Sequence, residues 1–309
     1  MSRIAFVFPG QGAQYVGMGK DFYENFQVCK DIFATAKEAT GLDVEAICFE
    51  ENEEINITEY TQIAMLTVEV ALAKVLEEKG IRPEVTAGLS LGEYGALVTA
   101  GVLSVEDAFK VVRQRGILMQ EAVPTGGAMA AILGLDGAVI ADICEKTEGI
   151  VSVANYNCPG QIVITGEEAA VDKACEALKE QGAKRCVKLN VSGPFHSAML
   201  QDAGAKLYEV LADVSLGEIK VPYLTNVTAD YVKDTANVKE LLKEQVYSSV
   251  KWQQSVEKMI EDGIDTFIEI GPGKTLAGFM RKIDKEKKVT MFNVEKIEDL
   301  EKIAALCQG

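Results

Sequence analysis

The chain has 309 residues, 48% of them hydrophobic and 25% charged, an ordinary composition for a globular enzyme large enough to form two domains. Its formal net charge of −16 argues against a nucleic acid partner, because phosphates repel so acidic a surface. No run of about 18 or more apolar residues occurs, so we expect no membrane-spanning segment and no membrane partner.

The N-terminus and the cysteines predict the compartment. Met1-Ser2-Arg3-Ile4 leads directly into an apolar run, without the features of a signal peptide. The cysteines are dispersed, with no CxxC pair and no clustering with histidine: Cys29, Cys48, Cys144, Cys158, Cys175, Cys186 and Cys307. This pattern indicates free thiols in a reducing compartment rather than a disulfide framework or a zinc site. We therefore expect a cytoplasmic protein without a bound metal.

Apolar strand-like runs alternate with helical periodicity, which predicts an α/β fold with a largely parallel sheet. The strands expected in that sheet are residues 4–8, 85–89, 221–225, 266–270 and 289–294. A helix is predicted over 61–79, where apolar residues recur at helical spacing until Gly80 and Pro83. Helical sequence also follows the second strand from Leu91 onward.

The middle of the chain follows a different order. It predicts strand, helix, strand, strand, helix and strand over residues 128–133, 136–146, 150–154, 161–165, 168–181 and 184–189. This βαββαβ order is ferredoxin-like, and glycine and proline at both ends are typical of hinges. We predict a large α/β-hydrolase-like domain over residues 1–124 and 194–309. A small ferredoxin-like domain over 125–193 is inserted in it, with a cleft between the two.

Ser90 is a candidate nucleophile. Gly88-Leu89-Ser90-Leu91-Gly92 fits the pattern G-x-S-x-G at a point where a strand gives way to a helix. Small flanking residues permit a sharp turn that sets the serine hydroxyl at a helix N-terminus, where the next backbone N–H can face an oxyanion. A structural turn is the alternative, because so short a pattern also occurs by chance.

His196 is the only histidine of the chain. A lone histidine is usually a packed or surface residue, but a serine nucleophile at neutral pH needs a base. His196 follows Ser192-Gly193-Pro194 at the predicted hinge, so it could face the cleft. The two assignments depend on each other, and the 47 acidic residues leave any carboxylate partner of His196 open.

Two glycine-containing loops resemble nucleotide-binding motifs but lack a required glycine. In the loop over residues 9–15, Tyr15 occupies the third glycine position of G-x-G-x-x-G. In the loop over 271–275, which ends like a P-loop, Ile268 occupies the position of the first glycine. We interpret residues 10–12 as a tight turn that presents backbone N–H groups near the site, and residues 271–273 as a structural turn.

Many ordered matches along almost the whole chain resemble the malonyl-CoA:acyl carrier protein transacylases of fatty acid synthesis. Besides the serine motif, they are Phe8-Pro9-Gly10-Gln11-Gly12, Tyr60-Thr61-Gln62, Gly92-Glu93-Tyr94, Arg115-Gly116, Met119-Gln120-Glu121-Ala122-Val123-Pro124, Asn155-Tyr156-Asn157, Pro159-Gly160-Gln161, Phe195-His196-Ser197 and Glu269-Ile270-Gly271-Pro272-Gly273. The family usually has histidine where this chain has Leu89, which removes a polar group near the site and bears on substrate preference more than on catalysis.

The resemblance implies roles for individual residues. Ser90 would carry the acyl group, with His196 as its base and acid, and Gln11 and Leu91 would supply backbone N–H groups to the oxyanion hole. Arg115 would bind the free carboxylate of the malonyl group. Further residues would lie near the substrate or favour malonyl groups: Gln62, Asn155, Asn157 and Phe195. A backbone carbonyl, expected near Val250 or Lys251, would orient the histidine.

The implied activity is an acyltransferase reaction by ping-pong kinetics, from malonyl-CoA through a malonyl-serine ester to the phosphopantetheine thiol of an acyl carrier protein. No bound cofactor is expected. An acidic carrier would need a basic patch, for which Lys184, Arg185 and Lys188, or the stretch 281–288, are candidates. The alternatives are a serine thioesterase or hydrolase, a discrete polyketide-synthase acyltransferase, and a non-catalytic α/β scaffold.

Overall fold

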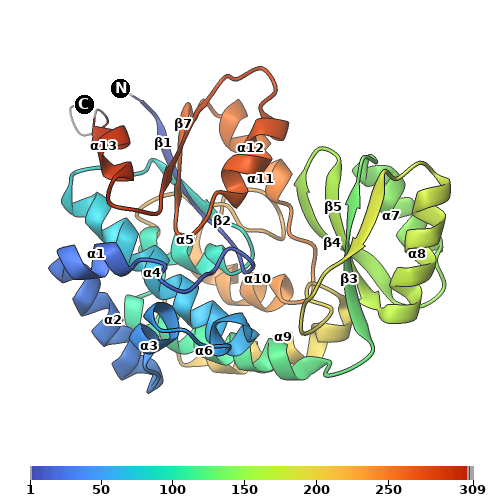
Figure 1. Ribbon diagram of the computed structural model, residues 1–309, viewed down its shortest axis with the longest axis horizontal. Helices are drawn as coiled ribbons and strands as arrows, with labels where there is room; N and C mark the ends of the chain where they lie inside the picture. The colour runs from blue at the N-terminus through green and yellow to red at the C-terminus, as the bar shows by residue number, and fades with distance from the viewer. Residues whose placement is uncertain (1, 305, 307–309) are drawn as a thin grey trace.

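The computed structural model describes residues 2–304 and 306, and its strands form two separate sheets (Figure 1). The first sheet is parallel, in the order β2-β1-β7-β8. Its strands are β1 (Ile4–Phe8), β2 (Val85–Gly88), β7 (Thr266–Ile270) and β8 (Thr290–Val294). The second sheet is antiparallel, in the order β4-β5-β3-β6. Its strands are β3 (Gly127–Leu133), β4 (Val151–Cys158), β5 (Gln161–Glu167) and β6 (Arg185–Lys188).

Helices cover both sheets. Those around the parallel sheet are α1 (Lys20–Asn25), α2 (Gln27–Thr40), α3 (Val44–Phe49), α4 (Thr58–Glu78), α5 (Gly92–Thr99), α6 (Val105–Ala122), α9 (Gln201–Ala212), α10 (Val238–Gln245), α11 (Trp252–Glu261), α12 (Thr275–Ile283) and α13 (Asp299–Ile303). The antiparallel sheet carries α7 (Gly137–Lys146) and α8 (Glu168–Glu180). Short 3₁₀ turns are η1 (Glu54–Asn56), η2 (Ala198–Leu200) and η3 (Thr235–Asn237).

The parallel sheet is buried on both faces, as its apolar strands predict. Alternate residues of β1 enter two different cores, because successive side chains of a strand point to opposite faces. Phe6 and Phe8 join the core formed with α2, α4, α5 and α6. Ala5 and Val7 join the core formed with α11 and α12. Both faces of the sheet are thus covered by helices, which leaves the strand ends as the places where polar residues can gather.

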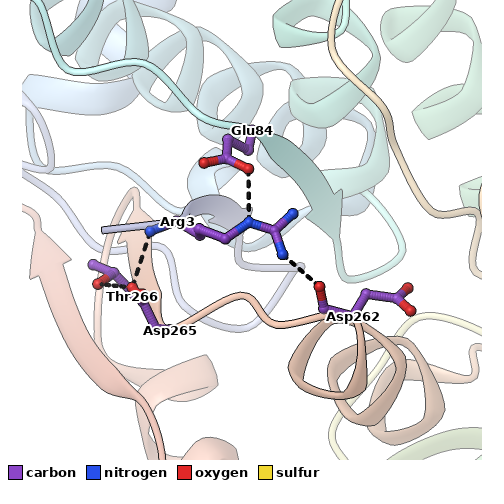
Figure 2. Close-up of polar contacts among 5 residues, drawn as sticks. All are labelled: Arg3, Glu84, Asp262, Asp265 and Thr266. Atoms are coloured by element: carbon purple, nitrogen blue, oxygen red, sulfur yellow. Dashed lines mark hydrogen bonds and ion pairs between the residues drawn. The ribbon is translucent and has the colours of Figure 1, made fainter. Parts of the chain in front are cut away.

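Three neighbouring strands are tied together at their N-terminal ends by Arg3 (Figure 2). Its Nε donates to Glu84 Oε2 at 2.9 Å, before β2, and its Nη1 donates to the carbonyl oxygen of Asp262 at 2.5 Å. Its backbone N–H donates to Asp265 Oδ1, before β7, at 3.0 Å. These contacts fix the sheet at the edge opposite the carboxyl ends of β1, β2 and β7, where ligands of open α/β sheets bind.

The predicted strands of the parallel sheet are confirmed with one exception. Residues 4–8 and 266–270 are strands over the full predicted ranges, and 85–89 and 289–294 each lose one residue at an end. The prediction for 221–225 was wrong: Tyr223 makes only an isolated parallel bridge to Thr86, and Leu224 an isolated bridge to Tyr231. Pro222 has no N–H for a ladder, and Ala229, with a positive φ of 56°, turns the chain back beside it.

The antiparallel unit has the predicted order of elements, β3-α7-β4-β5-α8-β6. Its own apolar core lies between the sheet and the two helices, which cover the side away from the parallel sheet (Figure 1). The chain enters and leaves the unit at one place, because a Cβ on Gly127 would lie 2.4 Å from Pro194. Within the described residues, no helix is long and apolar enough to cross a membrane. The cysteines that the structure describes are free, and Cys307 lies outside the described residues.

Candidate active site

Ser90 occupies a sharp turn between β2 and α5, with a φ of 53° that is uncommon outside glycine. The flanking glycines are required by close backbone approaches. A Cβ on Gly92 would lie 2.3 Å from the carbonyl oxygen of Phe8, and one on Gly88 would lie 1.9 Å from the carbonyl carbon of Gly92. The turn therefore lifts Ser90 out of the sheet at the N-terminus of α5, beside the end of β1.

His196 lies next to the serine. Its Nε2 is 2.8 Å from Ser90 Oγ, and its Nδ1 is 2.7 Å from the carbonyl oxygen of Gln245. A carbonyl oxygen only accepts, so the proton is assigned to Nδ1 and Nε2 is left to accept from the serine hydroxyl. This is the arrangement of an activated serine nucleophile.

The electrostatics keep His196 neutral. The side chain is buried, and burial together with the positive charge of Arg115 lowers the pKa of His196 to about 4. At neutral pH the imidazole is therefore unprotonated and able to accept the serine proton. After the transfer, the Gln245 carbonyl would still accept a hydrogen bond from the imidazolium.

The prediction that a carbonyl near Val250 or Lys251 orients the histidine was wrong in position. The Val250 carbonyl accepts from the backbone N–H of Tyr156 at 2.9 Å, which joins it to β4. The Lys251 carbonyl accepts from Ser255 at the start of α11. Both are occupied elsewhere, and the carbonyl of Gln245, the last residue of α10, orients the ring instead.

Arg115 brings a buried positive charge to the same place. It comes from α6 and is 1% exposed. Its Nη1 donates to Gln62 Oε1 at 2.7 Å, while Nη2 donates to Gln245 Oε1 at 3.0 Å and to Ser90 Oγ at 3.2 Å. Within the described part of the chain it forms no ion pair with a carboxylate. Arg113, two residues earlier on α6, pairs with Glu59 at 2.8 Å.

An unpaired buried cation is costly, and such groups in proteins are normally paired. Arg115 has only neutral amide and hydroxyl acceptors, and its Nε has no hydrogen-bond partner among the described residues. The side chain also lies over Tyr94, with 5.5 Å between the guanidinium carbon and the ring centroid. The arrangement therefore suits an incoming anionic group bound within reach of Ser90.

The candidate oxyanion donors lie on two adjoining segments. A Cβ on Gly10 would lie 2.7 Å from the carbonyl oxygen of Leu89, so the turn over residues 10–12 runs against the serine turn. The backbone N–H groups of Gln11 and Leu91 donate to no acceptor in residues 2–304 and 306. The Gln11 side chain donates from Nε2 to Thr58 Oγ1 at 3.0 Å. Two free N–H donors beside Ser90 are what a developing oxyanion requires.

Three other predicted residues make no hydrogen bond to Ser90, His196 or Arg115. Asn157 is buried on β4, and its Oδ1 has no partner among the described residues. Asn155 pairs through its backbone with the segment at Val250. Phe195 is buried beside Gly193 at the proposed hinge, in the larger core. Leu89 packs in the core under β2, with Cys158 and Leu276.

Sequence reasoning missed Gln245 and Asn226 as site residues. Gln245 contacts Arg115, His196 and the backbone of Ser90, and Asn226 Oδ1 accepts from the Ser90 N–H at 2.7 Å. Both are fully buried polar side chains. Asn226 directly follows the apolar run 221–225, and this position could have indicated it, whereas the sequence around Gln245 gives no sign of burial. In the described residues, no group of three or more His, Cys, Asp or Glu could hold a metal ion.

A groove of about 730 Å³ separates the antiparallel unit from the parallel one. Gly134, Tyr156 and Pro159 line it from one side, and Lys251 and Lys285 from the other. Ser90 and His196 do not line this groove, so it is a separate feature from the serine turn.

Comparisons with known proteins agree with this chemistry. A family model described as an acyl transferase domain matches residues 5–300. The malonyl CoA-acyl carrier protein transacylase of Bacillus subtilis is 47% identical over 304 residues, covering 96% of each chain. The crystal structure of the transacylase of that name from Clostridium perfringens superposes with a TM-score of 0.95. It is 46% identical and covers 99% of this chain and 98% of its own. The two share the α/β fold with a parallel and a separate antiparallel sheet.

A further solved structure, a malonyl-transacylase in complex with its type II PKS acyl-carrier protein, has a TM-score of 0.94 at 40% identity. It covers 99% of this chain and all of its own.

Proposed function

The chain belongs to the family of acyl transferase domains, and we propose that it transfers a malonyl group from coenzyme A to an acyl carrier protein through an ester on Ser90. One observation carries the proposal: a buried, unpaired guanidinium lies 3.2 Å from a serine hydroxyl that is 2.8 Å from a neutral histidine. These three side chains lie within one substrate length, which supports the roles of nucleophile, base and anion-binding group proposed for them. Malonyl transfer needs all three.

In the first half-reaction, Ser90 Oγ bonds to the thioester carbonyl carbon of malonyl-CoA and its proton passes to Nε2 of His196. The negative charge on the carbonyl oxygen would be stabilised by the N–H groups of Gln11 and Leu91. Collapse of this intermediate breaks the carbon–sulfur bond. The proton returns from Nε2 to the leaving thiolate, which gives coenzyme A and malonyl-Ser90.

In the second half-reaction, the phosphopantetheine thiol of the carrier protein enters the same site. His196 takes the thiol proton, the sulfur attacks the ester carbonyl, and the proton returns to Ser90 Oγ. The reaction needs no cofactor, because the thioester and ester bonds that carry the malonyl group have similar chemistry. His196 is neutral again at the end of each half-reaction.

Arg115 would bind the free carboxylate of the malonyl group in a bidentate contact. Gln62, which accepts from Nη1, would hold the guanidinium in place, and Asn155, Asn157 and Phe195 would line the acyl-binding region. We also propose that residues 1–124 and 194–309 form a hydrolase-like domain and residues 125–193 an inserted ferredoxin-like domain. The strand order β4-β5-β3-β6 and the contact between Gly127 and Pro194 support this division.

The carrier protein of fatty acid synthesis is the proposed acceptor, and a reducing cytoplasm, consistent with free thiols, is the proposed compartment. Of the basic residues considered for carrier docking, Lys188 is already paired with Glu168 and Asp172. In the stretch 281–288, Lys288 is paired with Glu286. The better candidates are the residues that form no ion pair in the described chain: Lys184, Arg185, Arg281, Lys282, Lys285 and Lys287.

The test is intact-mass measurement after mixing the purified protein with malonyl-CoA alone, within seconds and again after minutes. We expect a persistent gain of one malonyl unit, located on the peptide that contains Ser90, absent in Ser90→Ala and discharged by holo carrier protein. A transient gain with steady release of malonate would favour a hydrolase. A folded protein that gains no mass would contradict the proposed mechanism and favour a non-catalytic scaffold. Holo carriers of fatty acid and polyketide systems, compared by kcat/KM, would distinguish the two pathways.

A further inference from the structure

Glu93 is a buried carboxylate in the first turn of α5, three residues after the proposed nucleophile, and only 1% exposed. One of its oxygens, Oε2, accepts two hydrogen bonds. The backbone N–H of Asn226 donates to it at 3.1 Å, and Nε2 of Gln245 donates at 2.7 Å. Neither donor is on α5, so the carboxylate joins the serine turn to two distant parts of the chain.

The side chain of Asn226 forms hydrogen bonds with the serine turn at two points. Its Oδ1 accepts from the backbone N–H of Ser90 at 2.7 Å, and its Nδ2 donates to the carbonyl oxygen of Gly88 at 2.6 Å. These two bonds hold the backbone on both sides of Leu89, where the chain takes the left-handed conformation at Ser90. An uncommon φ of this kind persists only where surrounding contacts impose it.

Gln245 contacts all three groups of the proposed reaction. Its Nε2 donates to the Ser90 carbonyl oxygen at 2.9 Å, its Oε1 accepts from Arg115, and its backbone carbonyl accepts from His196. The two ends of its amide face groups of opposite character. Glu93 only accepts when ionised and Arg115 only donates, so together they allow one orientation of the amide.

We infer that Glu93 is a positioning residue for the acyl transfer proposed above. Its ionised carboxylate fixes Asn226 and Gln245, and through them holds Ser90, His196 and Arg115 in one arrangement. Along this network, Glu93 is also the negative charge nearest to the unpaired guanidinium of Arg115. The side-chain amide of Gln245 lies between them. The inference rests on the proposed function, and it adds a residue that touches neither substrate nor reacting atoms.

The charges around Glu93 make the inference testable by pH. Arg115 and Tyr94 face it from α6 and α5, and Tyr223, which makes the isolated bridge to β2, lies near it. The Gln245 and Asn226 groups are neutral. Burial raises the pKa of Glu93 to about 7, and the hydrogen bonds from Gln245 and Asn226 and the charge of Arg115 oppose that rise. The carboxylate should therefore lose its charge just below neutral pH, well above the pKa of His196 near 4.

The experiment measures two rates between pH 5 and 9, for the native protein and for Glu93→Gln. One is single-turnover formation of malonyl-Ser90. The other is modification of Ser90 by phenylmethanesulfonyl fluoride, which depends on the activated serine but not on malonyl binding. Glu69→Gln is the matched control, because Glu69 is also buried but makes no hydrogen bond to the site. Urea unfolding of each variant verifies that it folds.

We expect both native rates to fall as the pH drops through about 7. In Glu93→Gln both rates should be up to roughly 100-fold lower at pH 8, with no fall near pH 7, because misplacement of a reacting group costs rates of this order. Glu69→Gln should keep the native pH profile. A native profile that stays flat from pH 5 to pH 9 would overturn the inference even if Glu93→Gln does not fold. So would a variant that keeps the native rates and profile. Sulfonylation that follows this pattern without any malonyl adduct would support Glu93 while contradicting the proposed function.

Discussion

The guanidinium of Arg115 donates from Nη2 to Oγ of Ser90 across 3.2 Å, so the cation and the nucleophile are in direct contact before any substrate binds. A carboxylate that binds Arg115 would compete for this donor and leave the serine hydroxyl to His196. In the proposed reaction, binding of the acyl group's free carboxylate and activation of the serine would thereby be linked in one contact. The proposed role of Arg115 therefore predicts that the site favours diacid thioesters.

Arg115→Ala should reduce malonyl transfer much more than acetyl transfer. Loss of one partner of a buried charge-assisted pair costs about 2–5 kcal/mol, which is roughly 30- to 5,000-fold in kcat/KM. Acetyl-CoA has no carboxylate, so its slow transfer should change little. Arg115→Lys should recover only part of the loss, because an ammonium cannot bind the carboxylate bidentately. The measurement is kcat/KM for both thioesters.

Arg113→Ala is the control for this comparison. Arg113 lies on the same helix but pairs with Glu59 and does not contact Ser90. Its removal should leave the ratio of malonyl to acetyl transfer unchanged. A ratio that shifts equally in Arg113→Ala and Arg115→Ala would show that the effect comes from α6 as a whole rather than from one guanidinium.

His196 should make the protein less stable in acid. Its pKa is about 4 when folded and near 6.5 when unfolded, so the unfolded state binds the proton first as the pH falls. The stability contribution is complete above about pH 6.5 and is lost as the pH falls toward 4. At pH 5 the loss is about 2 kcal/mol. Glu93, whose pKa is raised, acts in the opposite direction over part of this range.

Urea unfolding of the native protein and His196→Gln at pH 7 and pH 5 isolates the histidine, because the other groups cancel in the difference. From pH 7 to pH 5, the difference in unfolding free energy between the two proteins should change by about 2 kcal/mol in favour of His196→Gln. An unchanged gap would mean that the imidazole is protonated as easily in the folded chain as in the unfolded one.

The fold was largely predictable because buried parallel strands are short apolar runs with sharp ends. Residues 4–8 and 266–270 show this, since every residue of each strand is buried. The prediction failed at 221–225, where an apolar sequence pairs through one residue of β2 only. This segment does not form a strand because Pro222 has no N–H and because the chain turns after it. The proline is visible in the sequence and argues against a strand, whereas an apolar run does not reveal the turn.

The site was predictable only in part. Ser90 follows from a strand, a turn and a helix, and His196 from being the only histidine. Arg115 could not be separated by periodicity from Arg113 and was identified by resemblance alone. Gln245 lies in the polar sequence Lys243-Glu244-Gln245, which is typical of an exposed helix end, and its burial arises from contacts with residues more than 100 positions away.

Gly92→Ala should disrupt the serine turn, whereas Gly278→Ala should stabilise the protein. A Cβ at position 92 would lie 2.3 Å from one backbone oxygen and 2.6 Å from another, at Phe8 and Pro9. Neither can move without shifting β1, so we expect a loss of about 1–3 kcal/mol or more, with loss of acylation. Gly278 lies within α12 with open space around it, and alanine there should add about 0.5–1 kcal/mol. Urea unfolding measures both, and equal effects would contradict the steric argument.

Thr58 should couple the oxyanion segment to the hinge of the antiparallel unit. Its Oγ1 accepts from Gln11 Nε2 at 3.0 Å and lies 2.7 Å from Ser192 Oγ. Thr58→Val keeps the shape but removes the hydroxyl, and the loss of about 1 kcal/mol corresponds to roughly a fivefold slower acylation. Thr58→Ser should restore the rate. In a double-mutant cycle with Ser192→Ala, the effects should not add, and full additivity would show that the two hydroxyls act independently.

Glu69→Gln should stabilise the protein increasingly as the pH rises. Glu69 on α4 is fully buried, both carboxyl oxygens lack hydrogen-bond partners among the described residues, and Glu269 on β7 lies near it. Burial, and then the Glu269 charge, raise the pKa of Glu69 well above its ordinary value, so the folded chain keeps this proton after the unfolded chain has lost it. Native stability is therefore complete below about pH 4.5 and falls at up to about 1.4 kcal/mol per pH unit above it.

The glutamine amide in Glu69→Gln cannot ionise, so the unfolding free energies of the two proteins at pH 5, 6, 7 and 8 should diverge in favour of the variant. Glu54→Gln, at an exposed carboxyl, should run parallel to the native protein. If Glu69→Gln runs parallel too, Glu69 must have a partner for its charge in solution.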